Sequence, residues 1–327
     1  MPRPPAMETQ RIELLARIAE MYYEQNLTQS QIAQKVGYSR SMISRMISEA
    51  RENNIVEIRI HYPLQRVREL EIYLQDALRL KEVRVLQRGA LTHTEMLRRL
   101  GAMAALMLEE HLHEHITIGT SWGTALFETV NAVRTQTLEG LRVVQMIGSL
   151  GTPNPDIDGP ELARRLARLL GGQYATMPLP LIVDSETTRT ALLNAPHVQR
   201  VIHHFSQIDL ALVGVGTVDF EYASLLRAGY LDYRQLESLR EAGAVGDVCA
   251  IHIDIQGNLI DTPLTRCIVG VDADTLRGIP VRIGVAGGQS KALPILAASR
   301  AGFINHLVTD EIAALRIQKY IEGEKAK

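Results

Sequence analysis

Cysteine and aromatic residues are scarce in this sequence. Its 327 residues include two Cys, one Trp and four Phe. The two cysteines, Cys249 and Cys267, are too few for a disulfide framework or a four-cysteine zinc site, and they fit a reducing compartment. No window approaches the roughly 18 consecutive apolar residues of a membrane span, and the first residues lack the apolar core of a signal peptide. These absences predict a cytoplasmic protein with no metal centre.

An excess of either charge is also missing. The chain has 35 Lys plus Arg and 37 Asp plus Glu, which gives a net charge of -2. A surface that binds a polyanion must therefore be a local patch, which excludes a histone-like protein but not a small DNA reader. With 46% hydrophobic and 22% charged residues, the composition is that of a compact globular chain with two or three domains.

The periodicity of apolar residues changes near Tyr62 and Pro63. Residues 11–53 show helical spacing throughout, whereas from Glu82 onward short β-branched runs alternate with helical segments. The sequence therefore predicts an N-terminal domain over residues 1–62 and a larger α/β domain over residues 63–327. A helix over residues 63–79 is expected to join them, and its apolar positions are also suited to pairing subunits.

The N-terminal domain is predicted to be a winged helix-turn-helix. A first helix spans residues 11–25, a capping box at Thr28 opens a short second helix, and Gly37 ends that helix. Ser39 caps a third helix that runs to about residue 53. The alternating segment over residues 55–60 is expected to form the strand that completes the wing.

The exposed edge of the second and third helices is polar and free of acid. Asn26 to Ser48 contains three cations and no Asp or Glu. A helix-turn-helix inserts the start of its last helix into the major groove, where hydroxyl groups reach phosphates and arginine grips guanine. The alternative is that these side chains only solvate a three-helix bundle. The residues predicted to contact DNA are Thr28, Gln29, Ser39, Arg40, Ser41, Ser44 and Arg45.

The second domain is predicted to contain a largely parallel sheet covered by helices. Near-continuous apolar runs such as Leu210–Gly214 are typical of strands that are buried on both faces. The predicted strands span residues 83–86, 116–118, 143–147, 173–175, 210–213, 248–253, 281–285 and 307–308. Predicted helices span residues 92–112, 123–133, 160–170 and 290–299.

Three glycine-bearing loops follow predicted strands, at residues 118–124, 144–151 and 283–291. Ligands of such sheets bind at the carboxyl ends of strands. The first loop offers hydroxyl groups and the N-terminus of a helix, and the third offers a lysine at a helix start, so both suit an anion. The alternative is that each loop is an ordinary turn. Neither dinucleotide-binding nor P-loop spacing is present, and no cofactor is expected.

Asp247, which precedes a predicted strand, is a candidate for binding sugar hydroxyls or, alternatively, a turn residue. Trp122 either closes over a ligand or packs in the core. The strand end at residues 145–147 offers no carboxylate or histidine, and the loops show no Asp-His pair for acid–base chemistry. The candidate effector-binding residues are Ser121, Trp122, Gly123, Thr124, Gln145, Asp247, Gly287, Gly288 and Lys291.

Ordered motifs across almost the whole chain resemble those of the SorC family of bacterial sugar-responsive transcriptional regulators, which includes central glycolytic gene regulators and deoxyribonucleoside regulators. The motifs that carry the resemblance are Ile18–Tyr23, Thr28–Ala33, Ser39–Arg45, Gly119–Thr124, Gly246-Asp247, Gly284–Ala292 and Leu307–Glu311.

The resemblance implies a winged helix-turn-helix joined to an effector domain like glucosamine-6-phosphate deaminase and ribose-5-phosphate isomerase, usually assembled into tetramers. It also implies that the loop Ser121–Thr124 and Lys291 contact phosphate, and that Asp247 contacts sugar hydroxyls. Several relatives carry Lys, Arg or Asn where this chain has Ile147, so a cationic contact or Schiff base at that position is not available here.

The leading hypothesis is a regulator that binds operator DNA and a phosphorylated sugar effector as a homo-oligomer, either a dimer or a tetramer. The second hypothesis is a sugar-phosphate isomerase or deaminase-like enzyme that carries a DNA-binding head. A third is a constitutive DNA-binding scaffold with a vestigial pocket. Binding of a sugar phosphate separates the first hypothesis from the third.

Overall fold

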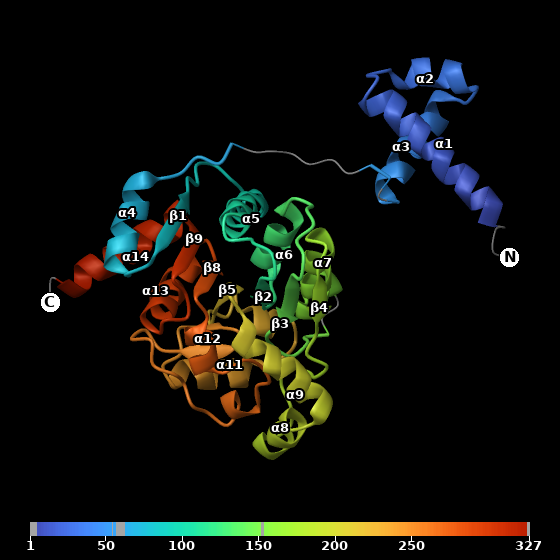
Figure 1. Cartoon of the computed structure of the whole chain (residues 1–327). Helices are drawn as coiled ribbons and strands as arrows, with labels where there is room; N and C mark the ends of the chain where they lie inside the picture. Colours follow the sequence, from blue (N-terminus) through green and yellow to red (C-terminus); the bar gives the residue numbers. More distant parts are fainter. Residues whose placement is uncertain (1–4, 54, 57–62, 152–153, 326–327) are drawn as a thin grey trace. The chain divides into compact units, whose positions relative to one another are not determined.

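The structure is a computed structural model, and it describes residues 5–53, 55–56, 63–151 and 154–325. The chain divides into two units, Met1–Pro63 and Leu64–Lys327. The division falls one residue after the boundary predicted from the sequence. Figure 1 labels most of the helices and strands of both units. No helix in the described ranges is long and apolar enough to cross a membrane.

The described part of the first unit contains three helices, α1 (Pro5–Tyr23), α2 (Gln29–Val36) and α3 (Arg40–Glu52). Its fully or nearly buried core comes from all three helices and includes Leu15, Ile18, Ile32, Ile43, Met46 and Ile47. The predicted caps are confirmed. Thr28 forms a capping box with Gln31, and Gly37 ends α2 at φ 74°, a conformation that glycine adopts without strain. The side chain of Ser39 accepts a hydrogen bond from the backbone of Met42.

Only part of the predicted wing strand can be placed. Ile55 and Val56 form a bend whose side chains pack against the three-helix core. The rest of the strand predicted over residues 55–60 lies outside the described residues. The helix-turn-helix is therefore established by α1, α2 and α3, and the wing stays a prediction.

The second unit is built around a nine-stranded sheet whose main path runs β1-β9-β8-β5-β2-β3-β4. All pairs along this path are parallel, which confirms the predicted α/β class. The strands are β1 (Glu82–Leu86), β2 (Thr117–Thr120), β3 (Arg142–Gln145), β4 (Gln173–Ala175), β5 (Leu210–Thr217), β6 (Gly246–Val248), β7 (Ile251–Ile253), β8 (Val281–Val285) and β9 (His306–Asp310).

Helices cover both faces of the sheet (Figure 1). Leu210 and Leu212 of β5 point into one buried cluster, and Ala211 and Val213 point into the other, as expected for successive strand residues. One cluster includes α5 (His93–Glu109), α6 (Thr124–Ala132) and α7 (Gly159–Leu169). The other includes α4 (Arg68–Ala77), α9 (Pro196–His203), α11 (Tyr233–Glu241), α12 (Ala273–Gly278), α13 (Ala292–Arg300) and α14 (Glu311–Lys325). The described part of the unit also contains the short helices α8 (Glu186–Leu193) and α10 (Ser224–Arg227).

The prediction of a single strand over residues 248–253 is wrong, because the segment folds into a hairpin. β6 and β7 pair with each other in antiparallel register, and β6 pairs with the extended end of β5. The turn consists of Cys249 and Ala250, which have φ values of 53° and 59°. Two successive left-handed residues are the signature of a tight hairpin turn, but that turn is usually built from Gly, Asn or Asp. The residues Cys249 and Ala250 therefore carry no sequence signal of a turn.

Two predicted helices are shorter than expected. Helix α4 begins at Arg68, because Val67 donates a backbone hydrogen bond of 2.9 Å to Val85 and so lies along the edge strand β1 instead. Most apolar side chains of α4 also pack inward, and Ile72 stays 70% exposed. The helix predicted over residues 290–299 begins as a single 3₁₀ turn at Gln289–Lys291, and α13 follows it.

Candidate functional site

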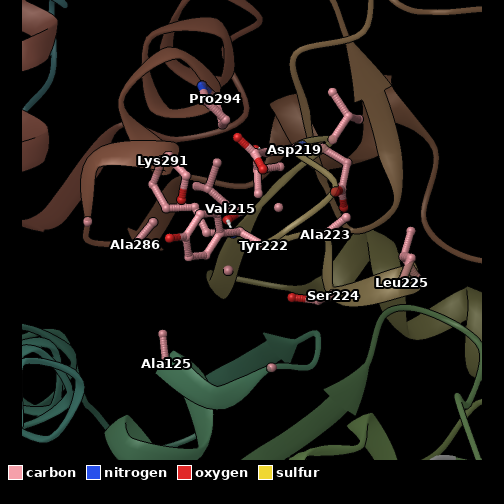
Figure 2. Close-up of a pocket in the computed structure, with 18 of the residues that line it drawn as sticks. Ala125, Val215, Asp219, Tyr222, Ala223, Ser224, Leu225, Ala286, Lys291 and Pro294 are labelled. Carbon is pink, nitrogen blue, oxygen red and sulfur yellow. Dashed lines mark hydrogen bonds between the residues drawn. The ribbon is translucent and has the colours of Figure 1, made fainter. Parts of the chain in front are cut away.

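A pocket of about 960 Å³ opens at the carboxyl ends of β2, β5 and β8. Strand β5 lies between β2 and β8 in the sheet, so the loops that follow the outer two strands face the pocket from both sides. Figure 2 shows Ala125, at the start of α6, across the open space from Lys291, Val215 and Tyr222. Two of the three predicted glycine loops thus meet at one site, as expected for ligand sites of parallel sheets.

The loop between β2 and α6 brings four predicted residues to the pocket: Ser121, Trp122, Gly123 and Thr124. Gly123 has φ 125° and stands at the N-cap of α6, where no side chain caps the helix within the described residues. The first amides of α6 therefore point toward the cavity, which gives this side of the pocket a partial positive charge. Thr124 is exposed, whereas the hydroxyl of Ser121 is buried and lies 3.5 Å from the amide of Gly214.

The loop after β8 brings Gly287, Gly288 and Lys291 to the opposite side. The amide of Gly288 donates a 2.9 Å hydrogen bond to Oδ1 of Asp310, which is fully buried at the end of β9. Oδ1 also accepts the amide of Ala313, and Oδ2 lies 3.5 Å from the guanidinium of Arg88. Asp310 therefore fixes the glycine loop and a pocket-lining arginine at the same time.

Lys291 places a buried amino group at the wall of the pocket. Its Nζ donates a 2.8 Å hydrogen bond to the carbonyl oxygen of Val215. Burial lowers its pKa to about 8; the Asp247 carboxylate opposes this shift, and Arg227 adds to it. A ligand anion beside Nζ would favour the charged ammonium. The lysine is therefore ready to bind a phosphate or carboxylate group.

Asp247 lies on β6 at the wall of the same pocket, 8% exposed. One oxygen accepts a 3.1 Å hydrogen bond from the amide of Ala250. The facing residue on β5 is Gly216, and a Cβ there would lie 1.8 Å from Oδ1 of Asp247. Gly216 thus leaves space for the carboxylate of Asp247. This close approach explains why the position is a glycine although the sequence around it matches no nucleotide-binding pattern.

Several polar residues of the pocket belong to no sequence motif, because segments distant along the chain supply them. Arg88 precedes α5, and Arg227 ends α10. The pKa of His93 is lowered, first by burial and then by the charges of Arg88 and Arg227, with a smaller effect from Lys291. Arg88, Arg227 and Lys291 therefore form a cationic region that favours the neutral form of His93, and the hydroxyl of Tyr222 belongs to the same lining.

The pocket also contains an Asp-His pair that the sequence analysis did not find. Asp247 and His252 lie directly opposite each other in the β6–β7 ladder, and both line the cavity. The sequence predicted no such pair in the loops, and these two residues lie on strands β6 and β7 instead. The reason is the hidden hairpin, which brings together two residues that a continuous strand would have separated.

Gln145 and the glycine loop that follows it do not reach the pocket. The Gln145 side chain is fully buried, with Oε1 accepting the amide of Met177 at 3.0 Å and Nε2 donating to Ser149 at 3.3 Å. A Cβ on Gly148 would lie 2.4 Å from the carbonyl oxygen of Pro180. This loop follows β3, which lies one strand farther along the sheet than β2, and it packs against neighbouring segments. Gln145 is therefore no longer a candidate for effector binding.

The predicted DNA-contacting residues share the surface of α2 and α3. Arg40, Ser41, Ser44 and Arg45 are exposed, as are Thr28 and Ser39, and Gln29 is half-buried. Hydroxyl groups of the two caps already accept backbone hydrogen bonds. Two exposed apolar residues, Tyr38 and Met42, stand at the same end of α3. Sequence reasoning overlooked them, although apolar side chains can contact thymine methyl groups.

The fold and the pocket define a helix-turn-helix protein with an α/β ligand-binding unit. A family described as "Putative sugar-binding domain" matches residues 62–319, and sigma-70, region 4, matches residues 16–53. The chain is 30% identical to the sorbitol operon regulator of Klebsiella pneumoniae over 93% of this chain and 96% of that protein. It is 32% identical to the transcriptional regulator LsrR of Enterobacter sp. (strain 638), over 92% of this chain and 91% of that protein.

The crystal structure of the full-length Klebsiella regulator SorC resembles this chain with a TM-score of 0.73. The likeness covers 94% of this chain and 98% of that one, at 30% identity. The protein belongs to the SorC family of transcriptional regulators with a sugar-binding domain. The family resemblance predicted from the sequence motifs is confirmed.

Proposed function

We propose that this protein binds operator DNA through α2 and α3, and that a phosphorylated sugar in the α/β pocket changes its affinity for DNA. The observation that carries the proposal is the pair of anion-binding elements on the two sides of β5. The uncapped N-terminus of α6 faces the cavity from one loop, and Lys291 faces it from the other. Backbone amides, a helix dipole and a lysine together suit a phosphate dianion.

In this proposal the phosphate lies between Thr124 and Lys291, with Gly287 and Gly288 permitting close approach. Arg88 and Arg227 add positive charge to the same pocket. Ser121 and Gly123 shape the first loop, and Trp122 lies against the ligand.

Asp247 is proposed to accept hydrogen bonds from the sugar, because a carboxylate repels phosphate but accepts from hydroxyl groups. A polar pocket with a cationic region and an acidic wall fits a phosphorylated polyhydroxy compound better than an apolar metabolite. Regulation rather than catalysis is proposed, because the relatives of this chain are named as transcriptional regulators.

The test combines ligand binding with DNA binding. A panel of sugar phosphates and their unphosphorylated sugars is titrated by calorimetry, and the best ligand is then added to a gel-shift assay with DNA from upstream of the protein's own operon. The proposal requires that the phosphorylated form binds more tightly, shifts the DNA affinity and is recovered chemically unchanged. Turnover of the sugar phosphate would favour the isomerase or deaminase alternative instead.

The Arg40→Ala and Arg45→Ala variants are expected to weaken operator binding while the fold stays intact, because both side chains are exposed on α3. An arginine that reads a base contributes roughly 1 to 3 kcal/mol and specifies one position, whereas an arginine on a phosphate weakens binding to all sequences and reduces the salt dependence. Fluorescence anisotropy at several salt concentrations measures both quantities.

Arg51→Ala is the matched control, because Arg51 is an exposed arginine in the last turn of the same helix. It is expected to change affinity less than either of the other variants. Unchanged binding by both Arg40→Ala and Arg45→Ala would exclude α3 as the recognition helix.

We further propose that the protein acts as a dimer or tetramer, because helix-turn-helix domains usually read two half-sites through a two-fold axis. Light scattering is expected to give a multiple of the 36.3 kDa chain mass. Ile72→Glu tests whether α4 contributes to association, with Leu259→Glu on a different exposed site as its control. A monomer at micromolar concentration that binds operator at full strength would contradict the proposal.

A further inference from the structure

Residues 65–67 form a short edge segment that lies along strand β1. The amide of Gln87 donates a 2.9 Å hydrogen bond to the carbonyl oxygen of Gln65, and the amide of Val67 donates one of the same length to Val85. Because β1 is the outer strand at one end of the main sheet path, these bonds pair backbone groups that an open sheet edge would leave free. The edge segment therefore moves with β1 for as long as both bonds last.

A buried carboxylate also fastens the edge segment to the sheet. Glu71 of α4 is 4% exposed. Its Oε1 accepts hydrogen bonds from the amide of Val85 at 2.9 Å and from Arg66 at 2.6 Å, and Oε2 accepts a second bond from Arg66 at 2.9 Å. Arg68 adds a 3.1 Å bond from a side chain that is 69% exposed. Separating a buried charge from its partner is costly, so the pair of Arg66 and Glu71 holds the edge segment in one arrangement.

The edge segment joins two functional parts of the chain. The second unit begins at Leu64, so the edge segment directly follows the connection to the helix-turn-helix unit. On β1 the hydrogen-bonded partner of Gln65 is Gln87, and the next residue, Arg88, lines the ligand pocket. A path of one hydrogen bond and a few covalent bonds therefore runs from the pocket to the start of the second unit.

Arg88 is held by two acids and can still respond to an anion in the pocket. Its amide donates a 3.0 Å hydrogen bond to Oε2 of Glu311, and its Nη1 lies 3.5 Å from Oδ2 of Asp310. The second distance is longer than an ordinary charge-assisted hydrogen bond, and the side chain is 16% exposed. Arg227 and Lys291 line the same pocket, so the three cations repel one another. An anion among them removes this repulsion and holds Arg88 more firmly.

We propose that the edge segment couples the ligand pocket to the DNA-binding unit. The phosphate group of the ligand steadies Arg88, the backbone of Gln87 is steadied with it, and the edge segment is held more tightly against β1 where the chain enters the second unit. This inference rests on the proposed function, because it takes a phosphorylated sugar to be the effector. It assigns the coupling to a contiguous hydrogen-bonded network that the ligand stabilises.

The mutational test uses Arg66→Met in the full chain, because Arg66 belongs to the edge segment and lies outside the pocket lining. The probes are D-ribose 5-phosphate, D-glucitol 6-phosphate and D-fructose 6-phosphate, and the tightest binder is used at saturation in the gel-shift assay. Arg66→Met is expected to bind it within about twofold of the wild type and to reduce the ligand-induced change in DNA affinity by about threefold or more.

Arg68→Met is the matched control, because Arg68 pairs with the same carboxylate from an exposed position on α4. It is expected to keep the full change in DNA affinity. Equal loss of this change in Arg66→Met and Arg68→Met would contradict a specific role of the edge segment.

Hydrogen exchange of the wild type gives a second readout that needs no variant. A saturating sugar phosphate is expected to slow exchange of the amides of Val67 and Gln87 by about threefold or more relative to the amide of Gln173. Gln173 is the reference, because its amide bonds to Leu141 at 2.9 Å on β4, at the other end of the main sheet path. Arg88→Gln is expected to abolish this difference even when the pocket is saturated.

The outcomes distinguish this inference from the proposed function. If no sugar phosphate binds the wild type, or none changes its DNA affinity, both fail. If saturated Arg66→Met and Arg88→Gln keep the full wild-type change in DNA affinity, the proposed function stands and the inference is wrong. The inference is also wrong if the ligand slows exchange at Gln173 as much as at Val67 and Gln87, and this measurement decides alone if Arg66→Met does not fold.

Discussion

Lys291→Ala is expected to lower the affinity for a phosphorylated sugar by ten- to a hundredfold and to leave the affinity for operator DNA without ligand unchanged. A charge-assisted hydrogen bond contributes about 1.5 to 3 kcal/mol, which corresponds to one to two decades in Kd. Lys291 lies on the pocket wall beside the glycine loop, and its ammonium is poorly solvated. Calorimetric titration and the fluorescence of Trp122, the only tryptophan, measure the loss.

The pH dependence of binding identifies the lysine as the group responsible. The pKa of Lys291 is lowered to about 8, so the ammonium that we propose binds phosphate is lost as the pH rises through this value. The wild type is therefore expected to bind a sugar phosphate more weakly at pH 9 than at pH 7, and Lys291→Ala is expected to show little of this change. Lys319→Ala, at an exposed position on α14, is the matched control.

Equal binding of phosphorylated and unphosphorylated sugars would contradict the phosphate site. So would an unchanged affinity in Lys291→Ala. Either result would support the alternative interpretation, in which the loops at residues 118–124 and 283–291 are ordinary turns.

Asp310→Ala is expected to destabilise the α/β unit by about 3 to 5 kcal/mol, because it removes a fully buried carboxylate that accepts two backbone amides and pairs with the partly buried guanidinium of Arg88. The carboxylate is fully buried, and it accepts hydrogen bonds from the amides of Gly288 and Ala313 beside the guanidinium of Arg88. Alanine would leave both amides without this acceptor and release the glycine loop. Chemical denaturation followed by Trp122 fluorescence measures the loss, and the same variant is expected to bind sugar phosphate poorly.

Asp310→Asn separates the hydrogen bonds from the charge. Its amide oxygen still accepts from the two backbone amides, so it is expected to lose less than half as much stability as Asp310→Ala. Asp274→Ala is the control, because Asp274 is 94% exposed and pairs only at the surface with Arg277. If Asp310→Ala unfolded at the same denaturant concentration as the wild type, the proposed role of Asp310 in holding the loop would be wrong.

The sequence by itself determined the features that depend on neighbouring residues. Helix ends depend on contacts within a few residues. The structure confirms that α2 begins after Thr28 and ends at Gly37, and that α3 begins after Ser39. The apolar run Leu210–Val213 is a central strand of a parallel sheet, because both faces of that strand must be buried. The class of the fold and the family follow from such local signals.

The tertiary structure alone decided which residues share the pocket. Gln145 precedes a glycine loop, as pocket residues do, but β3 lies one strand beyond β2, and the Gln145 side chain is used in packing. Arg88 and Arg227 have no motif around them, and they reach the cavity from segments far apart in sequence.

The position of His252 depended on a turn formed by Cys249 and Ala250, two residues that do not usually adopt left-handed conformations. A strained turn is stable only when the surrounding fold holds it. The tertiary contacts that stabilise the turn cannot be read from a local sequence pattern. The Asp247–His252 pair was therefore found only in the structure.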